Sequence, residues 1–219
     1  RGQRTNDTRG QRTNDTRGSR AADPTWLSAL EETMASKGIA VSVARQDMAG
    51  RLAAAALEGF GPFPGAEVAL AGDVEGWLAQ GPALAAEDRF REALAAARDE
   101  DARTGRTSCG PQRSDLLVRH RPKGQPAALC STGEQKALLI GLVLANARTR
   151  ALEEGAQPVL LLDEVAAHLD TARRGALFEA LADLGGQVWM TGTDVELFSP
   201  LQGRAQFFTV ADGGSVIET

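Results

Sequence analysis

The sequence has few of the residues on which disulfide-rich folds and many metal sites depend. Its 219 residues include no Tyr, 5% aromatic residues, two Cys and two His. Two cysteines cannot build a disulfide framework, and so few His and Cys argue against a zinc or iron centre. No apolar run approaches the roughly 18–20 residues of a membrane span, and no signal-peptide pattern is visible. We therefore expect a cytoplasmic protein with no membrane partner, with enough apolar residues (42%) for a sizeable core.

An excess of basic residues is also absent from most of the chain. The formal net charge is −5, and the first twenty residues hold six Arg against two Asp, which leaves −9 for the rest. Any DNA contact must then come from a local patch or from a groove between subunits. Residues 1–16 are a tandem octapeptide without apolar residues. We expect residues 1–20 to be a disordered tail or a start-site artefact, loose phosphate binding by the arginines being the alternative. The chain does not begin with Met, which suggests an incomplete coding sequence.

Helical patterns dominate residues 21–103. Asp23 and Pro24 predict a helix start, and Gly38 is expected to interrupt this helix. Further helices are expected over residues 41–57 and 82–103, and a short strand over residues 67–71. The arginines of the last helix could face DNA, although a solvated charged face is the commoner explanation. The composition changes near residue 104, where we place a domain boundary.

A polar turn at residues 130–135, Cys-Ser-Thr-Gly-Glu-Gln, opens a long apolar helix. Ser131 and Glu134 fit a capping box. The helix is apolar nearly all round and so is expected to be buried, with Gly155 after its end. Its first turn presents free N–H groups and a positive dipole end, which suits a phosphate. Taken alone, an ordinary capped core helix explains the pattern equally well.

An apolar strand over residues 159–162 then leads into two adjacent carboxylates, Asp163 and Glu164. Such a run is typical of a parallel sheet that is covered on both faces. At the carboxyl end of that strand, Asp163 would hold Mg²⁺ through water, and Glu164 would orient an attacking water as general base. An acidic pair at a strand end is weak evidence by itself.

The remaining elements place further polar residues near this edge. Asp170 caps a helix expected over residues 171–184, and a second buried strand is expected over residues 187–190. That strand ends in Thr-Gly-Thr-Asp at residues 191–194, on the same sheet edge as Asp163. A hairpin is expected over residues 206–217.

The order and spacing of these motifs resemble those of ABC-type ATPases. The run Ser-Thr-Gly-Glu-Gln-Lys-Ala-Leu-Leu from Ser131, the upstream Gly-Pro-Gln-Arg-Ser-Asp of residues 110–115 and the Thr-Gly-Thr-Asp stretch resemble the RecF family within them. Gln112 departs from this pattern, since the family usually has His there. The implied fold is α/β, with the C-terminal lobe of an ABC-type ATPase (a P-loop NTPase-like, mostly parallel sheet with helices) over residues 104–219 and a mainly helical inserted domain over residues 21–103.

The resemblance also implies roles for individual residues. The signature residues would contact the γ-phosphate of ATP held by a partner subunit, Asp163 and Glu164 would act as the Walker B and catalytic carboxylates with Mg²⁺, and two further residues would belong to the dimer-interface loop and the switch. The signature residues are Ser131, Gly133 and Gln135. The residue of the dimer-interface loop is Asp170, and that of the switch is Thr193. Many ABC ATPases have His at the switch, so Thr193 separates this chain from transporters. His168, beside the Leu169-Asp170 turn, is expected to be structural.

For function, the resemblance implies an ATP-dependent homodimer that binds DNA at single-strand/double-strand gaps. It further implies roles in DNA replication, recombination, repair and the SOS response, with RecR and RecO as partners and RecA loading as the outcome. The sequence contains no Gly-x-x-x-x-Gly-Lys-Ser/Thr P-loop, which lies N-terminal in this family, so the chain alone is not expected to hydrolyse ATP. The alternatives are another ABC-type ATPase, SMC-like or a transporter cassette, and a truncated, non-catalytic partner-binding module.

Overall fold

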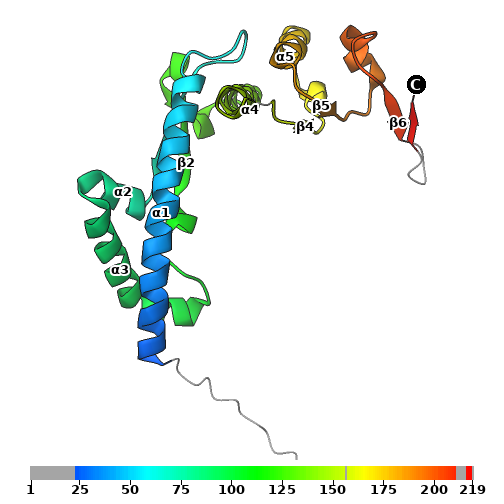
Figure 1. Cartoon of the computed structure of the whole chain (residues 1–219). Coiled ribbons are helices and arrows are strands. Elements are labelled where there is room, and N and C mark those ends of the chain that lie inside the picture. The colour runs from blue at the N-terminus through cyan, green and yellow to red at the C-terminus, as the bar shows by residue number, and fades with distance from the viewer. Residues whose placement is uncertain (1–22, 156, 211–215, 219) are drawn as a thin grey trace, which may run out of the picture.

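The computed structural model describes residues 23–155, 157–210 and 216–218. The octapeptide repeat lies outside these residues, so its expected disorder stays a prediction. Helix α1 (Pro24–Ala56) runs along most of the molecule, with α2 (Asp73–Gln80) and α3 (Ala83–Thr104) beside it (Figure 1). Helix α4 (Thr132–Glu154) crosses near the C-terminal end of α1, and α5 (Thr171–Leu184) and small strands extend to one side.

Helix α1 is one continuous helix of 33 residues, so the expected interruption at Gly38 is wrong. Asp23 caps it as expected, since its carboxylate accepts the Thr25 N–H at 2.9 Å. Gly38 lies against α3, where a Cβ would come within 2.4 Å of Phe90 Cε1. Phe90 is fully buried in the core that α1, α2 and α3 share. Close helix packing therefore outweighs the low helix propensity of Gly.

A three-stranded antiparallel sheet covers the other side of α1. Its order is β1-β2-β3, formed by β1 (Ala66–Ala71), β2 (Asp115–His120) and β3 (Gln125–Pro126). Short 3₁₀ helices flank these strands at Pro111–Arg113, Arg121–Lys123 and Ala127–Leu129. The sheet thus joins residues on both sides of the expected boundary near residue 104, and the division into two domains stays a prediction.

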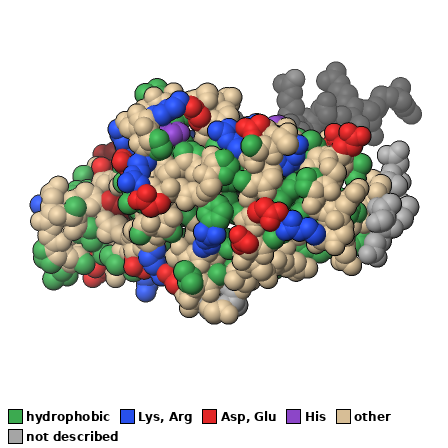
Figure 2. Space-filling view, turned by 90° about the horizontal axis from the view of Figure 1, so that it is seen from above, with side chains coloured by type: hydrophobic (Ala, Val, Ile, Leu, Met, Phe, Trp, Pro, Cys, Tyr) green, Lys and Arg blue, Asp and Glu red, His purple; other side chains and the backbone are tan. Residues whose placement is uncertain are grey.

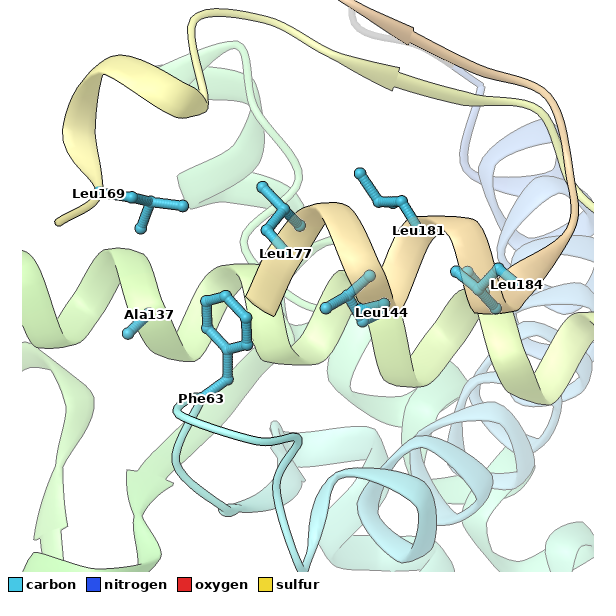
Figure 3. Close-up of a cluster of buried hydrophobic side chains, with 9 residues drawn as sticks. Phe63, Ala137, Leu144, Leu169, Leu177, Leu181 and Leu184 are labelled. Atoms are coloured by element: carbon cyan, nitrogen blue, oxygen red, sulfur yellow. The ribbon is translucent and has the colours of Figure 1, made fainter. Parts of the chain in front are cut away.

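The packing of α4 against α5 forms the main hydrophobic core, shown in Figure 3. Leu144 of α4 meets Leu177, Leu181 and Leu184 of α5, and Phe63 closes the cluster from the loop before β1. Each fully buried side chain of this size contributes about 1.5–3 kcal/mol to the hydrophobic free energy of folding. The expectation of a helix buried all round is wrong, however, because Leu139 is 61% exposed.

The expected parallel pair is confirmed. Strands β4 (Leu160–Leu162) and β5 (Val188–Met190) pair in parallel, with Leu161 opposite Trp189. Their even-numbered residues pack on the α4–α5 core. The other side is open, because Leu161 is 76% and Trp189 is 50% exposed. The expectation of a sheet covered on both faces is therefore wrong for the described chain. The wider expectation of a mostly parallel sheet also fails there, since β4–β5 is the one parallel pairing among the described strands.

Beyond β5 the chain forms a 3₁₀ helix, Val195–Leu201, and the antiparallel pair β6 (Phe208–Val210) and β7 (Val216–Glu218). This pair is the expected hairpin, and its turn lies outside the described residues. Another 3₁₀ helix, Ala166–His168, joins β4 to α5. Within the described ranges, no helix is both long and apolar enough to cross a bilayer.

Candidate functional site

The first turn of α4 is an exposed, capped helix N-terminus. The capping box is present, with the Ser131 N–H donating to Glu134 Oε2 at 3.0 Å. Helical bonding begins with the Gln135 N–H, which donates to the Ser131 carbonyl at 2.9 Å. Among the described residues, no acceptor is found for the N–H groups of Thr132 and Gly133, and both residues are exposed. The turn therefore offers two free donors at the positive end of a helix dipole.

Glu134 is held by a residue that the sequence did not single out. The Lys123 ammonium, in the turn before β3, forms an ion pair with Glu134 Oε1. This contact, with the hydrogen bonds from Ser131, lowers the pKa of Glu134 to about 2. The same contact raises the pKa of Lys123. The pair connects the turn before β3 to the first turn of α4. The sequence around Lys123 does not indicate Glu134 as its partner.

Gln135 fixes the chain just before the helix. Its side-chain Nε2 donates to the Cys130 carbonyl at 3.1 Å and to the Ala128 carbonyl at 3.4 Å. The side chain is therefore turned toward the 3₁₀ segment that precedes α4. Its expected contact with a nucleotide stays a prediction, as do those of Ser131 and Gly133.

At the end of β4, one hydroxyl joins the two carboxylate residues. Thr191, directly after β5, donates its hydroxyl to Asp163 Oδ1, and the Glu164 N–H donates to the same hydroxyl oxygen at 3.1 Å. The Thr191 N–H in turn donates to the Leu162 carbonyl at 3.0 Å, which extends the parallel ladder. The structure thus brings Asp163, Glu164 and Thr191 together at the expected edge. The sequence placed Thr191 at this edge without assigning it a role.

Glu164 has an unusual backbone. Its φ is +52°, and among the described residues it is the one non-glycine residue with positive φ. A non-glycine residue in the left-handed region costs on the order of 1 kcal/mol, and such residues cluster at functional sites. Glu164 is half-buried and lies in this strained turn, directly after the exposed Asp163.

The other expected site residues lie on separate elements. Asp170 is the N-cap of α5, where its carboxylate accepts the Arg173 N–H at 2.8 Å. Thr193 and His168 are exposed, and the Gln112 side chain donates to the Cys109 carbonyl at 2.9 Å. The dimer-loop and switch roles of Asp170 and Thr193 therefore stay predictions.

Two cavities, of about 60 and 230 Å³, open between α1 and α4. Neither is lined by Ser131, Asp163 or Glu164. At the two candidate elements, the α4 turn and the β4–β5 edge, Ser131 and Asp163 are exposed. A nucleotide bound at either element would need additional residues to enclose it.

The residues at the β4–β5 edge fit Mg²⁺ only as part of a larger site. Within the described ranges, no group of three or more His, Cys, Asp or Glu side chains could hold a metal ion. Asp163 is exposed and has one oxygen engaged by Thr191. Mg²⁺ commonly takes one or two carboxylates and fills its octahedron with water and phosphate oxygens. Asp163 fits that role, whereas a site built from protein ligands alone does not fit.

Comparison with known proteins gives a consistent family. The chain is 55% identical over 190 residues to the DNA replication and repair protein RecF of Mesorhizobium japonicum, a match that covers 86% of this chain and 50% of the relative. It is 54% identical over 191 residues to RecF of Brucella abortus, again with 86% and 50% coverage. No family model matches the chain. The chain therefore spans about half the length of the curated relatives it matches.

A solved structure of the recombination mediator protein RecF-ATPrS in the RecFOR pathway has a TM-score of 0.69 to this fold, at 20% identity. The match covers 90% of this chain and 52% of that one. The corresponding RecF-ATP structure gives a TM-score of 0.66 with the same coverage. The fold is thus an α/β, largely helical part of a RecF architecture. With this fold and more than half of the aligned residues identical to curated RecF proteins, the chain belongs to the RecF family.

Proposed function

We propose that this chain supplies the signature, Walker B, dimer-loop and switch part of a RecF-like ATPase that acts in DNA replication and repair. The observation that carries the proposal is the edge formed by Asp163, Glu164 and Thr191 at the carboxyl ends of two parallel strands. Ligands of open α/β sheets bind at that end of the strands. Relatives named as replication and repair proteins, and the solved RecF-ATP structure, support the same function.

We assign the following roles to these residues as part of the proposal. Asp163 would bind the hydration shell of Mg²⁺ with the carboxylate oxygen that Thr191 leaves free. Glu164, aimed by its left-handed backbone, would orient the attacking water and accept its proton. Mg²⁺ when bound neutralises the developing phosphate charge. Asp170 would serve the dimer interface and Thr193 the switch next to the γ-phosphate.

The signature turn would act on a nucleotide held by another subunit. The free N–H groups of Thr132 and Gly133 suit phosphate oxygens. Ser131 and Gln135 would complete the contact. The turn is exposed and lines neither of the two cavities between α1 and α4, so a second subunit would enclose it. ATP would then join two subunits of a homodimer, and hydrolysis would release them.

The cellular role belongs to the same proposal. We place the homodimer in the cytoplasm on gapped DNA, at single-strand/double-strand junctions, with RecO and RecR as partners and RecA loading as the outcome. On the face in Figure 2, Lys and Arg side chains are scattered among Asp and Glu rather than gathered in one patch. We propose that the DNA site is built by the dimer. The expected division at residue 104, with a helical inserted domain before it and an ATPase lobe after it, is part of this proposal.

The test requires a chain that includes a P-loop segment as well as these residues. Ser131→Arg places a long cation where the phosphate would enter, so ATP-dependent dimerisation should be lost while nucleotide binding by the monomer stays near normal. Ser36→Arg adds the same charge on an exposed part of α1 and should dimerise like wild type. Sedimentation with and without ATP measures both. Unchanged dimerisation of Ser131→Arg would refute the trans assignment.

A non-catalytic, partner-binding module is the second candidate, because no P-loop motif occurs in the 219 residues. The two candidates differ in an ATPase assay. The 219-residue chain should show no turnover, and the chain with a P-loop segment should hydrolyse ATP. Absence of turnover in the longer chain as well would favour the non-catalytic module.

A further inference from the structure

We propose that Thr191 is the positioning residue of this site, whose single hydroxyl fixes the Asp163 carboxylate and the Glu164 backbone at the same time. The inference rests on the proposed ATPase function and deepens it. The geometry needs no direct contact between Thr191 and nucleotide. In this role Thr191 acts on hydrolysis through Asp163 and Glu164, whereas the signature turn acts on ATP-dependent dimerisation.

The hydroxyl of Thr191 is used in both directions. A Thr hydroxyl has one hydrogen to donate and two lone pairs to accept with. Here the hydrogen goes to Asp163 Oδ1, and a lone pair accepts the Glu164 N–H at 3.1 Å. With its one donor engaged, the hydroxyl cannot turn away without breaking the bond to Asp163. The two acidic residues are thereby held in one fixed relation.

The backbone of Thr191 is fixed as well. Its N–H donates to the carbonyl of Leu162, the residue before Asp163, at 3.0 Å. This hydrogen bond of the parallel ladder fixes the position of Thr191 relative to β4. The following residue is equally constrained, because a Cβ on Gly192 would lie 2.6 Å from Phe198 Cε2. The β-branched Thr side chain has few χ1 states, which keeps the hydroxyl on the Asp163 side.

The hydrogen bond to the Thr191 hydroxyl matters most for the backbone conformation of Glu164. Its φ of +52° is unfavourable for a residue with a side chain and persists only where neighbours hold it. The bond from its N–H to Thr191 is such a constraint. Without the hydroxyl, the Glu164 N–H loses its acceptor and the carboxylate is free to turn away from the attacking water. Asp163 also loses the donor that orders one of its two oxygens.

The hydroxyl can be removed with little change in shape. Thr191→Val replaces it with a methyl group, and Thr191→Ser keeps it while removing the methyl. Thr33→Val is the matched control, because it removes a Thr hydroxyl that bonds only its own helix, at the Ala29 carbonyl. All three are made in the chain that includes a P-loop segment. The measurements are kcat and KM for ATP, and ATP-dependent dimerisation.

Thr191→Val should lower kcat by about 10²-fold, the lower end of what a positioned general base contributes. KM and dimerisation should stay within about threefold of wild type, and Thr191→Ser and Thr33→Val should keep kcat. A Thr191→Val enzyme with wild-type kcat would overturn the inference. So would a Thr191→Ser enzyme as slow as Thr191→Val, because the hydroxyl would then not be the active group.

A second readout does not depend on ATP. In the 219-residue chain, exchange of the Glu164 amide hydrogen should be about tenfold faster in Thr191→Val and unchanged in Thr191→Ser. Equal exchange in wild type and Thr191→Val would show that the bond does not hold Glu164, even if a variant were too unstable for kinetics. If the wild-type chain that includes a P-loop segment shows no ATP turnover while Glu164 exchange responds as expected, the proposed function fails and the Thr191 geometry stands.

Discussion

Lys123 and Glu134 form an ion pair across 11 residues, joining the turn before β3 to the first turn of α4. Their contact, together with hydrogen bonds from Ser131, lowers the pKa of Glu134 to about 2. Lys123→Met should raise this pKa toward the ordinary value of 4.5, stopping short of it because the hydrogen bonds from Ser131 remain. A carboxyl ¹³C NMR titration of Glu134 measures the shift, and Lys37→Met, an exposed Lys on α1, should leave it unchanged. An unmoved Glu134 in Lys123→Met would show that the pair does not persist in solution.

A matched pair of glycines on α1 tests close helix packing. Gly38→Ala puts a Cβ within 2.4 Å of Phe90 Cε1 in a filled core, whereas Gly50→Ala meets nothing within 4 Å. Overpacking costs about 1–3 kcal/mol, and Gly→Ala on a free helix surface stabilises by about 0.5–1 kcal/mol. Urea unfolding should therefore move in opposite directions for the two variants. Equal stabilisation by both would mean that α3 does not press on Gly38.

The pair of Glu31 and Arg98 should give the fold a measurable pH dependence. The Arg98 guanidinium donates to both oxygens of the buried Glu31, at 2.5 and 2.6 Å, and this lowers the pKa of Glu31. A carboxyl with a lowered pKa in the folded state stabilises the fold above its ordinary pKa, near 4.5, and loses this effect as the pH falls further.

Glu31→Gln should therefore be less stable than wild type at pH 7, with the gap closing below about pH 4.5 as the wild-type carboxylate is protonated. Urea midpoints across this range measure the gap. Its exposed neighbour provides the comparison, because Glu32→Gln should leave the midpoint nearly unchanged at every pH. A gap that is independent of pH would point to lost packing rather than a lost ion pair.

We expect the Glu164 side chain to lower the stability of the fold while it serves catalysis. Glu164→Gly removes the side chain from a residue with φ +52°, where Gly is not strained, so the free energy of unfolding should rise by about 1 kcal/mol. Glu164→Gln keeps a Cβ and should unfold near wild type. Denaturant unfolding of the 219-residue chain compares the two, and a destabilised Glu164→Gly would show that the side chain is held by favourable contacts.

Much of the fold could be predicted from local signals. The capping box at Ser131, the N-cap at Asp170 with a helix over Thr171–Leu184, and the parallel pairing of β4 with β5 are all confirmed. These features depend on residues within a few positions of one another, or on an apolar run that ends in polar residues. Short-range chemistry of this kind is legible in a single sequence.

The parts that could not be predicted depend on partners far along the chain. Gly38 is accommodated in α1 because of Phe90, a residue on another helix. Thr191 bonds to Asp163 across 28 residues, and no local pattern selects it over Thr193. An apolar run likewise predicts burial without indicating which chain segment provides the cover, so the open side of β4 and β5 does not follow from the sequence.

The open side of β4 and β5 presents Leu161 and Trp189, and together with the exposed Val159 and Phe208 it should determine how this chain associates at high concentration. Trp189 and Phe208 stack with ring centroids 6.0 Å apart, so the patch continues from β5 onto the hairpin. Water-exposed apolar surface of this kind associates with other apolar surface, and ammonium sulfate strengthens that association. Sulfate should consequently drive the 219-residue chain into reversible clusters, and a charged residue at position 161 should keep it dispersed.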